Sequence, residues 1–207
     1  MTRIIFIRHG ETRHNVDLVI TSGAPGGPLT ERGEDQARAL ADQLSDIDVA
    51  AVYSSPLTRA VQTATALGRE VVLRDDLREC SVGDLEGRGD QDSFARFDLT
   101  FEHWYHETDP DLDFPLGPNG ETGTAAVARV ASVVRDVLRA HDGQTVAVVG
   151  HGTVLQLALT TLCVNLAPSF GYRRWIANAG TVLVDVAERG LVCLEWSGVA
   201  VDELELT

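Results

Sequence analysis

The sequence contains little cysteine and no long hydrophobic run. Its three cysteines, Cys80, Cys163 and Cys193, are an odd number, and their spacing fits neither a disulfide framework nor a zinc site. We therefore expect reduced thiols, which are typical of cytoplasmic proteins. No apolar stretch approaches the roughly 20 residues that span a bilayer, and no secretory signal is visible at the N-terminus. These absences predict a cytoplasmic protein without a membrane partner.

Positive charge is scarce as well. The chain has 17 Lys and Arg residues against 31 Asp and Glu residues, which gives a formal net charge of −14. A nucleic-acid-binding surface needs clustered basic residues, so we expect no nucleic-acid partner. Because such a protein repels anions at long range, any anion-binding site has to be a local concentration of Arg and His side chains.

The composition is otherwise that of an ordinary globular domain. Hydrophobic residues make up 44% and charged residues 23% of the chain, and 207 residues fit a single domain, 1–207, with one insertion. Periodicity and turn residues predict strands at 3–8, 49–53, 70–73 and 145–149, and helices at 30–45, 57–67, 121–138 and 153–163. A C-terminal hairpin is expected from 181–187 and 191–196, with its turn at Arg189-Gly190. This order predicts an α/β fold, a three-layer α/β/α arrangement with a mostly parallel central sheet.

Residues 84–120 depart from this pattern. They combine many acidic residues with several prolines and lack a clean period, apart from a short helix that we expect near 93–103. We interpret the segment as an insertion that lies over the sheet edge like a lid. Its aromatic side chains suit either a wall of the substrate pocket or the core of the lid. They are Phe94, Phe97, Phe101, Trp104 and Tyr105.

Charged and polar residues stand at the ends of three predicted strands. The first strand ends in Arg8-His9-Gly10, the second leads through Ser54-Ser55-Pro56 to Arg59, and the fourth ends in Gly150-His151-Gly152. In a parallel sheet these ends share one edge, where α/β proteins bind their ligands. Arg side chains pair with phosphoryl oxygens, a neutral imidazole can attack phosphorus, and the following helix N-termini offer N–H donors. The pattern therefore indicates phosphoryl chemistry.

Five motifs in order make the chain resemble the histidine phosphatase (phosphoglycerate mutase-like) superfamily. They are Arg8-His9-Gly10-Glu11-Thr12 with Asn15, the segment 28–33 (PLTERG), the segment 54–64 (SSPLTRAVQTA), the segment 77–87 (LRECSVGDLEG), and Gly120-Glu121-Thr122 followed by 148–152 (VVGHG). The sequence departs from residues frequent in the family at Ala24, Gly26 and Leu85. These positions belong to the pocket mouth and its supports, so they bear on the substrate and leave the phosphate centre as in the family.

The resemblance implies a phosphoglycerate mutase-like fold and a role for each matching residue. His9 would be the nucleophile that becomes phosphohistidine, and Glu79 would donate a proton to the leaving oxygen and later activate water. Arg8, Arg59 and His151 would hold the phosphoryl oxygens. Further candidates for contacts to phosphate or substrate are Asn15, Thr21, Ser22, Gly23, Gly152 and Thr153. No metal and no cofactor is implied. Asn15 suits a second interpretation, as a cap of the following turn.

Several alternatives stay open from the sequence. A zinc site made of His9, His14 and His151 is a poor fit, because no two ligands have the usual spacing on one element. The remaining histidines, His14, His103, His106 and His141, are expected to be solvated.

The superfamily contains phosphatases and mutases, and three classes of function follow from the resemblance. We favour a phosphatase for a small phosphorylated metabolite, because Arg88 and Arg96 of the insertion are surrounded by acidic residues and suit a doubly anionic ligand poorly. A mutase and a non-catalytic phospho-ligand-binding module are the alternatives. Arg173-Arg174 suits either a surface pair or a distal substrate contact. The substrate itself is left open, and we expect a monomer or a homodimer.

Overall fold

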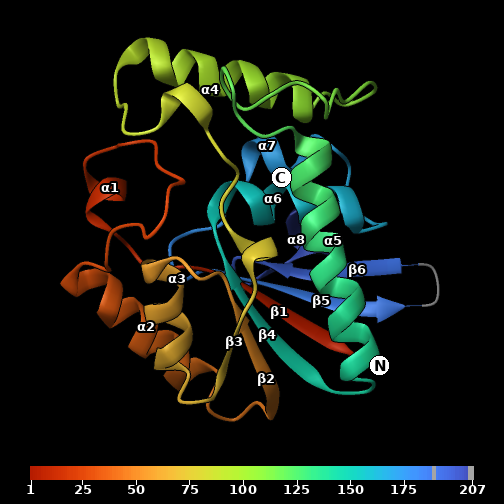
Figure 1. Ribbon diagram of the computed structural model, residues 1–207. Coiled ribbons are helices and arrows are strands. Elements are labelled where there is room, and N and C mark those ends of the chain that lie inside the picture. Colours follow the sequence, from red (N-terminus) through yellow and green to blue (C-terminus); the bar gives the residue numbers. More distant parts are fainter. Residues whose placement is uncertain (188–189, 205–207) are drawn as a thin grey trace.

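A seven-stranded sheet forms the centre of the computed structural model, which describes residues 1–187 and 190–204 of the chain. The strand order is β3-β2-β4-β1-β5-β6-β7 (Figure 1). The strands are β1 (Arg3–Arg8), β2 (Val49–Ser54), β3 (Val71–Leu73), β4 (Thr145–Gly150), β5 (Thr181–Ala187), β6 (Gly190–Trp196) and β7 (Val199–Ala200). β3, β2, β4 and β1 run parallel to one another, and β5, β6 and β7 continue the sheet in antiparallel fashion. The predicted mostly parallel α/β sheet is thus confirmed.

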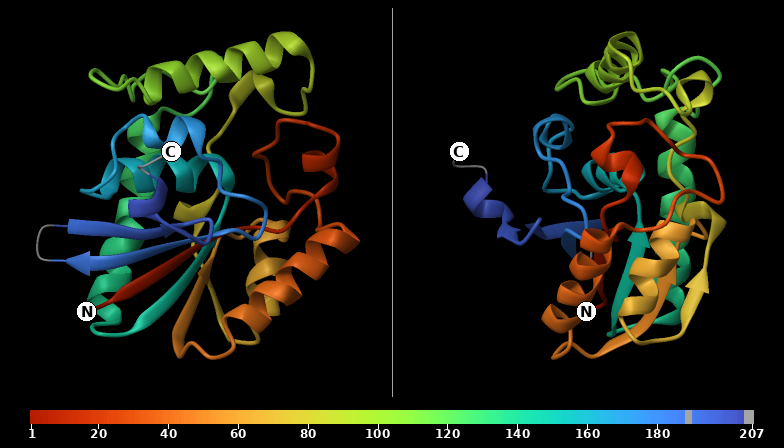
Figure 2. Two further views of the ribbon diagram at one scale, coloured as in Figure 1. Left: turned by 180° about the vertical axis from the view of Figure 1, so that it is seen from behind. Right: turned by 90° about the vertical axis from the view of Figure 1, so that its left-hand side faces the viewer.

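Helices lie on both faces of this sheet (Figures 1 and 2). The α-helices are α1 (Arg13–Val16), α2 (Glu31–Gln43), α3 (Thr58–Ala66), α4 (Gln91–Trp104), α5 (Gly123–Ala140), α6 (Gly152–Leu162), α7 (Phe170–Arg173) and α8 (Val201–Leu204), with two 3₁₀ turns, η1 (Asp75–Leu77) and η2 (Gly83–Leu85). The five longer α-helices correspond to those expected from the sequence. The four-residue helices and the two-residue strand β7 were not predicted, because segments this short carry no periodic signal.

Alternation along β1 explains why both faces are covered. Ile4 and Phe6 belong to the large core cluster beneath α5 and α6, whereas Ile5 and Ile7 belong to a smaller cluster beneath α2 and α3. All four side chains are at most 2% exposed. A strand whose every side chain is buried requires a covering layer on each side, and this produces the three-layer arrangement.

The insertion is more firmly packed than a mobile lid. The C-terminal half of α4 buries Phe101 and Trp104 in the large core cluster, together with the C-cap residue Tyr105. The Trp104 indole N–H donates to the Phe114 carbonyl at 2.8 Å. The N-terminal half carries the partly buried Phe94 and Phe97. Figure 1 shows α4 across one end of the domain, beyond α6 and α7. The insertion therefore serves both as core and, as described below, as pocket wall.

Two further sequence predictions concern the N-terminus of α2 and the C-terminal hairpin. Thr30 caps α2, since its hydroxyl accepts the Gly33 N–H at 3.0 Å, as expected from the sequence. β5 and β6 pair as the predicted hairpin. Of the predicted turn residues, Arg189 lies outside the described residues, and Gly190 is the first residue of β6, paired with Ala187. None of the helices in the described ranges is long and apolar enough to cross a bilayer.

Candidate active site

The site lies where β1, β2 and β4 end. Two backbone hydrogen bonds hold the loops that follow these strands side by side, from His9 N–H to the Gly150 carbonyl and from Ser55 N–H to the Val149 carbonyl, both 3.0 Å long. A cavity of about 340 Å³ opens there. Of the predicted site residues, its walls include Arg8, His9, Asn15, Thr21, Arg59, Glu79, Gly152 and Thr153. His151, which is fully buried, lies directly behind Arg59. The parallel sheet therefore brings together residues 8–9, 59, 79 and 151.

His9 is a buried, neutral imidazole whose lone pair lies on one ring nitrogen, Nε2. Its Nδ1 lies 2.7 Å from the carbonyl oxygen of Gly10, so Nδ1 carries the proton and donates. Nε2 is then the basic nitrogen, and it accepts a hydrogen bond from Arg59 Nε at 3.1 Å. Burial lowers the pKa of His9 well below its usual value, and the charges of Arg59 and Arg8 lower it further. A neutral imidazole whose Nε2 carries the lone pair can act as a nucleophile once the phosphoryl group takes the place of the Arg59 hydrogen bond.

Arg59 links the two histidines. Its Nε also lies 3.2 Å from His151 Nδ1, and His151 Nε2 lies 2.8 Å from the hydroxyl of Ser55. Burial, followed by the charge of Arg59, holds the pKa of His151 well below the ordinary range. Among the described residues, Arg59 Nη1 and Arg8 Nε are buried without a hydrogen-bond partner. Unpaired guanidinium N–H groups beside a cavity suit an anion with several oxygens, since a phosphoryl group can accept from both.

Glu79 is held at the N-terminus of α6. Its carboxylate accepts from the N–H groups of Cys80 at 2.9 Å, Thr153 at 3.1 Å and Val154 at 2.9 Å. The N-terminus of α6, one of the helix N-termini expected to offer N–H donors to phosphate, is therefore engaged by Glu79. Gly152 contributes space, because a Cβ at this position would lie 3.2 Å from Arg8 Nε. The arrangement places a carboxylate on the wall of the same cavity as His9.

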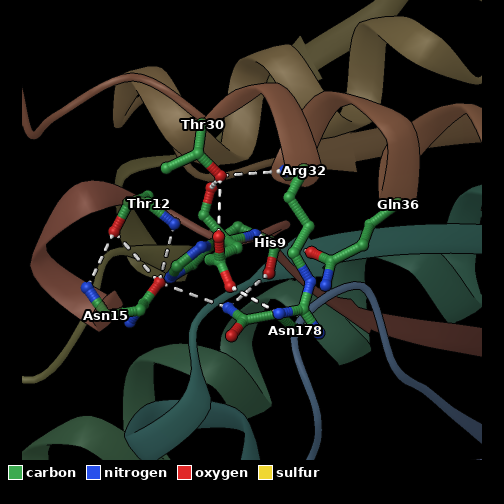
Figure 3. A network of polar contacts seen from close by, with 9 residues as sticks. His9, Thr12, Asn15, Thr30, Arg32, Gln36 and Asn178 are labelled. Atoms are coloured by element: carbon green, nitrogen blue, oxygen red, sulfur yellow. Dashed lines mark hydrogen bonds and ion pairs between the residues drawn. The ribbon is translucent and has the colours of Figure 1, made fainter.

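Asn15 caps α1, which confirms one of its two interpretations, and it also lies on the cavity wall. Its Oδ1 accepts from Thr12 N–H at 3.0 Å, and Thr12 and Asn15 together form a capping box at the start of α1 (Figure 3). Oδ1 is also 3.3 Å from Nδ2 of Asn178. Because Thr12 N–H and Asn178 Nδ2 both donate to the same atom, that atom of the Asn15 amide is the oxygen. The Nδ2 group of Asn15 is then the donor that a ligand in the cavity can use, since Asn15 lines the cavity.

A model of the histidine phosphatase superfamily (branch 1) matches residues 4–198 of the chain. The chain belongs to this superfamily. It is 31% identical over 206 residues to the metal-independent phosphoserine phosphatase of Arabidopsis thaliana, covering 97% of this chain and 83% of that protein. It is 29% identical to a probable phosphoglycerate mutase, GpmB, of Enterobacter sp., covering 95% of this chain and 90% of that protein.

Solved structures of histidine phosphatases share the fold. The phosphoserine phosphatase of Entamoeba histolytica, in a variant solved with phosphoserine, superimposes with a TM-score of 0.78 at 25% identity, over 95% of this chain and 97% of that one. A mycobacterial glucosyl-3-phosphoglycerate phosphatase superimposes with a TM-score of 0.81 at 23% identity, over 95% of this chain and 98% of that one. The predicted phosphoglycerate mutase-like fold is confirmed.

Sequence reasoning missed the segment 176–180 of this histidine phosphatase. Asn178 Nδ2 donates to the His9 carbonyl at 3.2 Å, the Ala179 N–H donates to the same oxygen at 3.1 Å, and Arg8 Nη1 donates to the Ile176 carbonyl at 2.7 Å. Asn178 and Trp175 also line the cavity. The sequence offers little that points to residues 176–180 as part of the site, because it is the antiparallel pairing of β5 with β1 that brings them beside His9.

The loop 21–23 differs from its expected role. Thr21 lines the cavity, whereas Ser22 and Gly23 are not among the lining residues. The polar groups of all three are hydrogen-bonded to the carboxylate of Glu86. Gly26, a position where the sequence departs from the family, comes close to Arg59, since a Cβ there would lie 2.5 Å from Arg59 Nη1. The backbone at Gly26 therefore lies against the guanidinium of Arg59.

The remaining histidines of this histidine phosphatase do not all behave as expected. His14 is half-buried and lines the cavity, which corrects the prediction that it is solvated. His141 lies 2.9 Å from the Tyr53 hydroxyl, and His103 stacks on the ring of Phe114. In the part of the chain that the structure describes, no group of three or more His, Cys, Asp or Glu side chains is placed to hold a metal ion.

The aromatic residues of the insertion divide between the two roles considered. Phe94 and Phe97 line the cavity together with Trp175. Phe101, Trp104 and Tyr105 are at most 4% exposed and belong to the core. Successive turns of α4 therefore face the pocket and the core, which the sequence alone left undecided.

Proposed function

We propose that this histidine phosphatase hydrolyses phosphomonoesters of small metabolites through a phosphohistidine formed at His9, without a metal. The observation that carries the proposal is the geometry of His9, a buried neutral imidazole whose Nε2 is hydrogen-bonded to Arg59. The unpaired N–H groups of Arg8 and Arg59 supply the complementary charge for a phosphoryl group.

The first half of the reaction forms a nitrogen–phosphorus bond. The phosphate of the substrate lies against Arg8 and Arg59, with His151 behind Arg59 as its hydrogen-bond partner, and His9 Nε2 attacks phosphorus opposite the ester oxygen. The ester P–O bond breaks, and Glu79 gives the departing oxygen a proton, which Glu79 takes from the substrate monoanion as the phosphate binds. The products are the alcohol and a phosphohistidine whose charge is balanced by Arg8 and Arg59.

The second half transfers the phosphoryl group to water. Glu79, now a carboxylate, takes a proton from a water molecule as the water oxygen attacks phosphorus. The N–P bond breaks, inorganic phosphate leaves, and His9 returns to its neutral form with the proton on Nδ1. Asn15, through Nδ2, and the cavity-lining Thr153 assist by contacting phosphoryl or substrate oxygens.

Similar proteins support a phosphatase with small phosphorylated metabolites as substrates. Among them are phosphoserine phosphatases at 29–31% identity, but also the probable phosphoglycerate mutases. The insertion favours hydrolysis, since Arg88 is exposed and paired with Asp90 at 2.7 Å. Arg174 lies over the Phe170 ring at 4.7 Å, and the side chain of Arg173 lies outside the described part. A mutase remains the alternative.

The proposal also covers the cellular location and the oligomeric state of the enzyme. Cys80, Cys163 and Cys193 are free and buried, and burial raises the pKa of each thiol. Buried reduced cysteines support a cytoplasmic location. Monomer and homodimer are both compatible with the chain, and size-exclusion chromatography with light scattering distinguishes them.

Hydrolysis of para-nitrophenyl phosphate with and without a chelator tests the proposal. We expect turnover that the chelator leaves unchanged, and we expect His9→Ala to abolish it in a protein with an unaltered circular dichroism spectrum. Rapid quenching should trap an acid-labile phosphoryl group on the wild type and none on His9→Ala. His106→Ala is the matched control and should retain both signals. Chelator-sensitive turnover, or a phosphorylated His9→Ala variant, would contradict the mechanism. Isomerisation of 3-phosphoglycerate with a bisphosphoglycerate primer would establish the mutase instead.

A further inference from the structure

The cavity beside His9 has two chemically different parts. At the phosphate end, polar side chains are joined by hydrogen bonds around the nucleophile, since Arg59 donates to His9 Nε2 and Asn178 donates to the His9 carbonyl. Apart from His14 and Thr21, the rest of the wall is apolar and includes Ile20, Val82, Phe94, Phe97 and Trp175. A substrate whose phosphate lies at His9 therefore places its leaving group against this apolar wall.

The apolar wall is formed by the loop around residue 20, the segment around residue 82 and helix α4. Ile20 and Val82 are at most 8% exposed and belong to the large core cluster, against which Phe94 and Phe97 pack. A backbone hydrogen bond of 2.8 Å from the Ile20 N–H to the Arg88 carbonyl joins the loop to the start of the insertion. The wall is thus continuous with the folded core, so a ligand meets a preformed apolar surface.

Trp175 is the most exposed aromatic side chain of this wall. Its ring lies against that of Phe101, with 5.3 Å between the ring centroids and 31° between the planes. Phe101 is 2% exposed, whereas Trp175 is 49% exposed and lines the cavity. One side of the indole is therefore supported by the core and the remainder is open to a ligand. Such a surface suits an aromatic ring, because ring pairs with centroids roughly 4.5–7 Å apart attract each other.

Permanent positive charge on the described part of the cavity wall is confined to the phosphate end. It is carried by Arg8 and Arg59, of which Arg59 donates to His9 and Arg8 precedes His9 in the chain. The Thr21 hydroxyl already donates to Glu86 at 2.6 Å. A carboxylate on the leaving group would lose hydration against apolar side chains without gaining a cation, which is unfavourable.

We propose that Trp175, together with Phe94 and Phe97, forms a leaving-group subsite that binds an uncharged group carrying an aromatic ring. This proposal rests on the proposed phosphatase function and narrows its substrates to phosphomonoesters of uncharged aromatic alcohols. The cavity of about 340 Å³ is at the lower end of the range of small-molecule sites, roughly 300–1,000 Å³, so it suits a phosphate with one ring system. On this proposal the chain differs in substrate from its relatives named phosphoserine phosphatases.

Three esters of primary hydroxyl groups test the proposal. Phenethyl phosphate has an aromatic leaving group, glycerol 3-phosphate an uncharged polar one, and phosphoserine a charged one. For the wild type we expect kcat/KM for phenethyl phosphate to exceed the other two values by at least about tenfold. Trp175→Ala should lower the value for phenethyl phosphate by about tenfold, since one ring contact and the apolar area that it covers are lost. The values for the other two esters should change by less than about threefold.

Two further variants separate the ring contact from a general effect of substitution. Trp175→Phe keeps an aromatic ring and should retain most of the preference for phenethyl phosphate. Tyr172→Ala removes another exposed aromatic side chain of the same segment, one that is not among the cavity-lining residues, and should keep the wild-type ratios. A wild type that prefers phosphoserine or glycerol 3-phosphate, equal losses on all three esters in Trp175→Ala, or the same change in Tyr172→Ala would each overturn the proposal.

Non-hydrolysable ligands measure the subsite without turnover. In 3-phenylpropylphosphonate and 2-amino-4-phosphonobutyrate, a methylene group replaces the ester oxygen of phenethyl phosphate and phosphoserine. Calorimetry should show at least about tenfold tighter binding of the first, and Trp175→Ala should remove this preference. Because Trp104 and Trp196 are at most 2% exposed, acrylamide quenching of tryptophan fluorescence reports mainly on Trp175. We expect 3-phenylpropylphosphonate to reduce the quenching.

These measurements distinguish failure of the subsite from failure of the phosphatase function. If none of the esters is hydrolysed but 3-phenylpropylphosphonate binds preferentially and shields Trp175 from acrylamide, the proposed hydrolysis is wrong and the subsite stands. If the esters are hydrolysed but the two phosphonates bind equally and leave the quenching unchanged, the subsite is wrong and the hydrolysis stands.

Discussion

The two buried histidines should make the stability of this protein depend on pH in a range where carboxylates contribute little. Burial is the main reason that the pKa values of His9 and His151 are well below normal in the folded state. In the unfolded chain each imidazole titrates near pH 6.5. Below that pH the unfolded state binds protons that the folded state does not, so the free energy of unfolding must fall as the pH is lowered.

The size of the effect follows from this difference. An imidazole that stays neutral in the folded state and titrates at about 6.5 in the unfolded state lowers the free energy of unfolding by about 1.4 kcal/mol between pH 7.5 and pH 5.5. His9 and His151 together therefore account for about 2–3 kcal/mol. Asp and Glu side chains titrate near pH 4 and are still almost fully ionised at pH 5.5.

Urea unfolding at the two pH values measures this directly. The buffers must exclude phosphate and sulfate, because an anion that binds beside Arg8 and Arg59 would stabilise the folded state by mass action. We expect His9→Asn to halve the pH-dependent change, and His106→Asn, which alters an exposed imidazole, to leave it as in the wild type. Equal stability at both pH values would refute the reasoning, because the imidazoles would then titrate normally and would not be neutral by virtue of burial.

Three further substitutions probe the catalytic wall and the packing. Asn178→Ala removes two hydrogen bonds, to the His9 carbonyl and to Asn15, and should lower kcat by about tenfold to a hundredfold with a small change in KM, since the nucleophile is then less well positioned; an unchanged kcat would show that Asn178 is dispensable. Glu79→Gln should lower kcat for alkyl phosphates by about 10²–10⁴-fold, and much less for para-nitrophenyl phosphate, whose leaving group needs little protonation; equal losses on both esters would contradict the proton-donor role. Trp104→Ala should lower the free energy of unfolding in urea by about 3–5 kcal/mol, because Trp104 is 1% exposed and donates to the Phe114 carbonyl. A decrease of less than about 1 kcal/mol in the free energy of unfolding would mean that the insertion packs independently of the core.

Much of the fold was predictable from local pattern. In β1 every side chain between Ile4 and Ile7 is apolar, which predicts a strand buried on both faces, and the alternation with amphipathic helices then implies a parallel sheet. Strands of a parallel sheet end at the same edge. For this reason the positions of Arg8, His9 and His151 in one site were predictable, although they are up to 143 residues apart in the sequence numbering.

Other parts of the site depend on contacts that no local pattern encodes. Asn178 reaches the carbonyl of His9 from 169 positions away, and its role follows from the pairing of β5 with β1. The donors of Thr21 to Gly23 were predicted to meet substrate, but they meet Glu86, which comes from 63 to 65 positions further along the chain. A carboxylate and an N–H group attract each other wherever the fold places them together, and sequence spacing does not reveal that placement.

The sequence by itself determined the superfamily, the α/β fold and the residue types of the phosphate centre, since these depend on periodicity and on short motifs at strand ends. The specific roles of Glu79, His9 and Arg59 in catalysis remain predictions for the experiments above. Only the tertiary structure decided which hydrogen-bond donors are already engaged, which tautomer His9 adopts, and that α4 divides its aromatic side chains between core and cavity. The physical reason is that burial and hydrogen bonding are properties of the packed chain, and it is these that engage the donors of residues 21–23 with the carboxylate of Glu86.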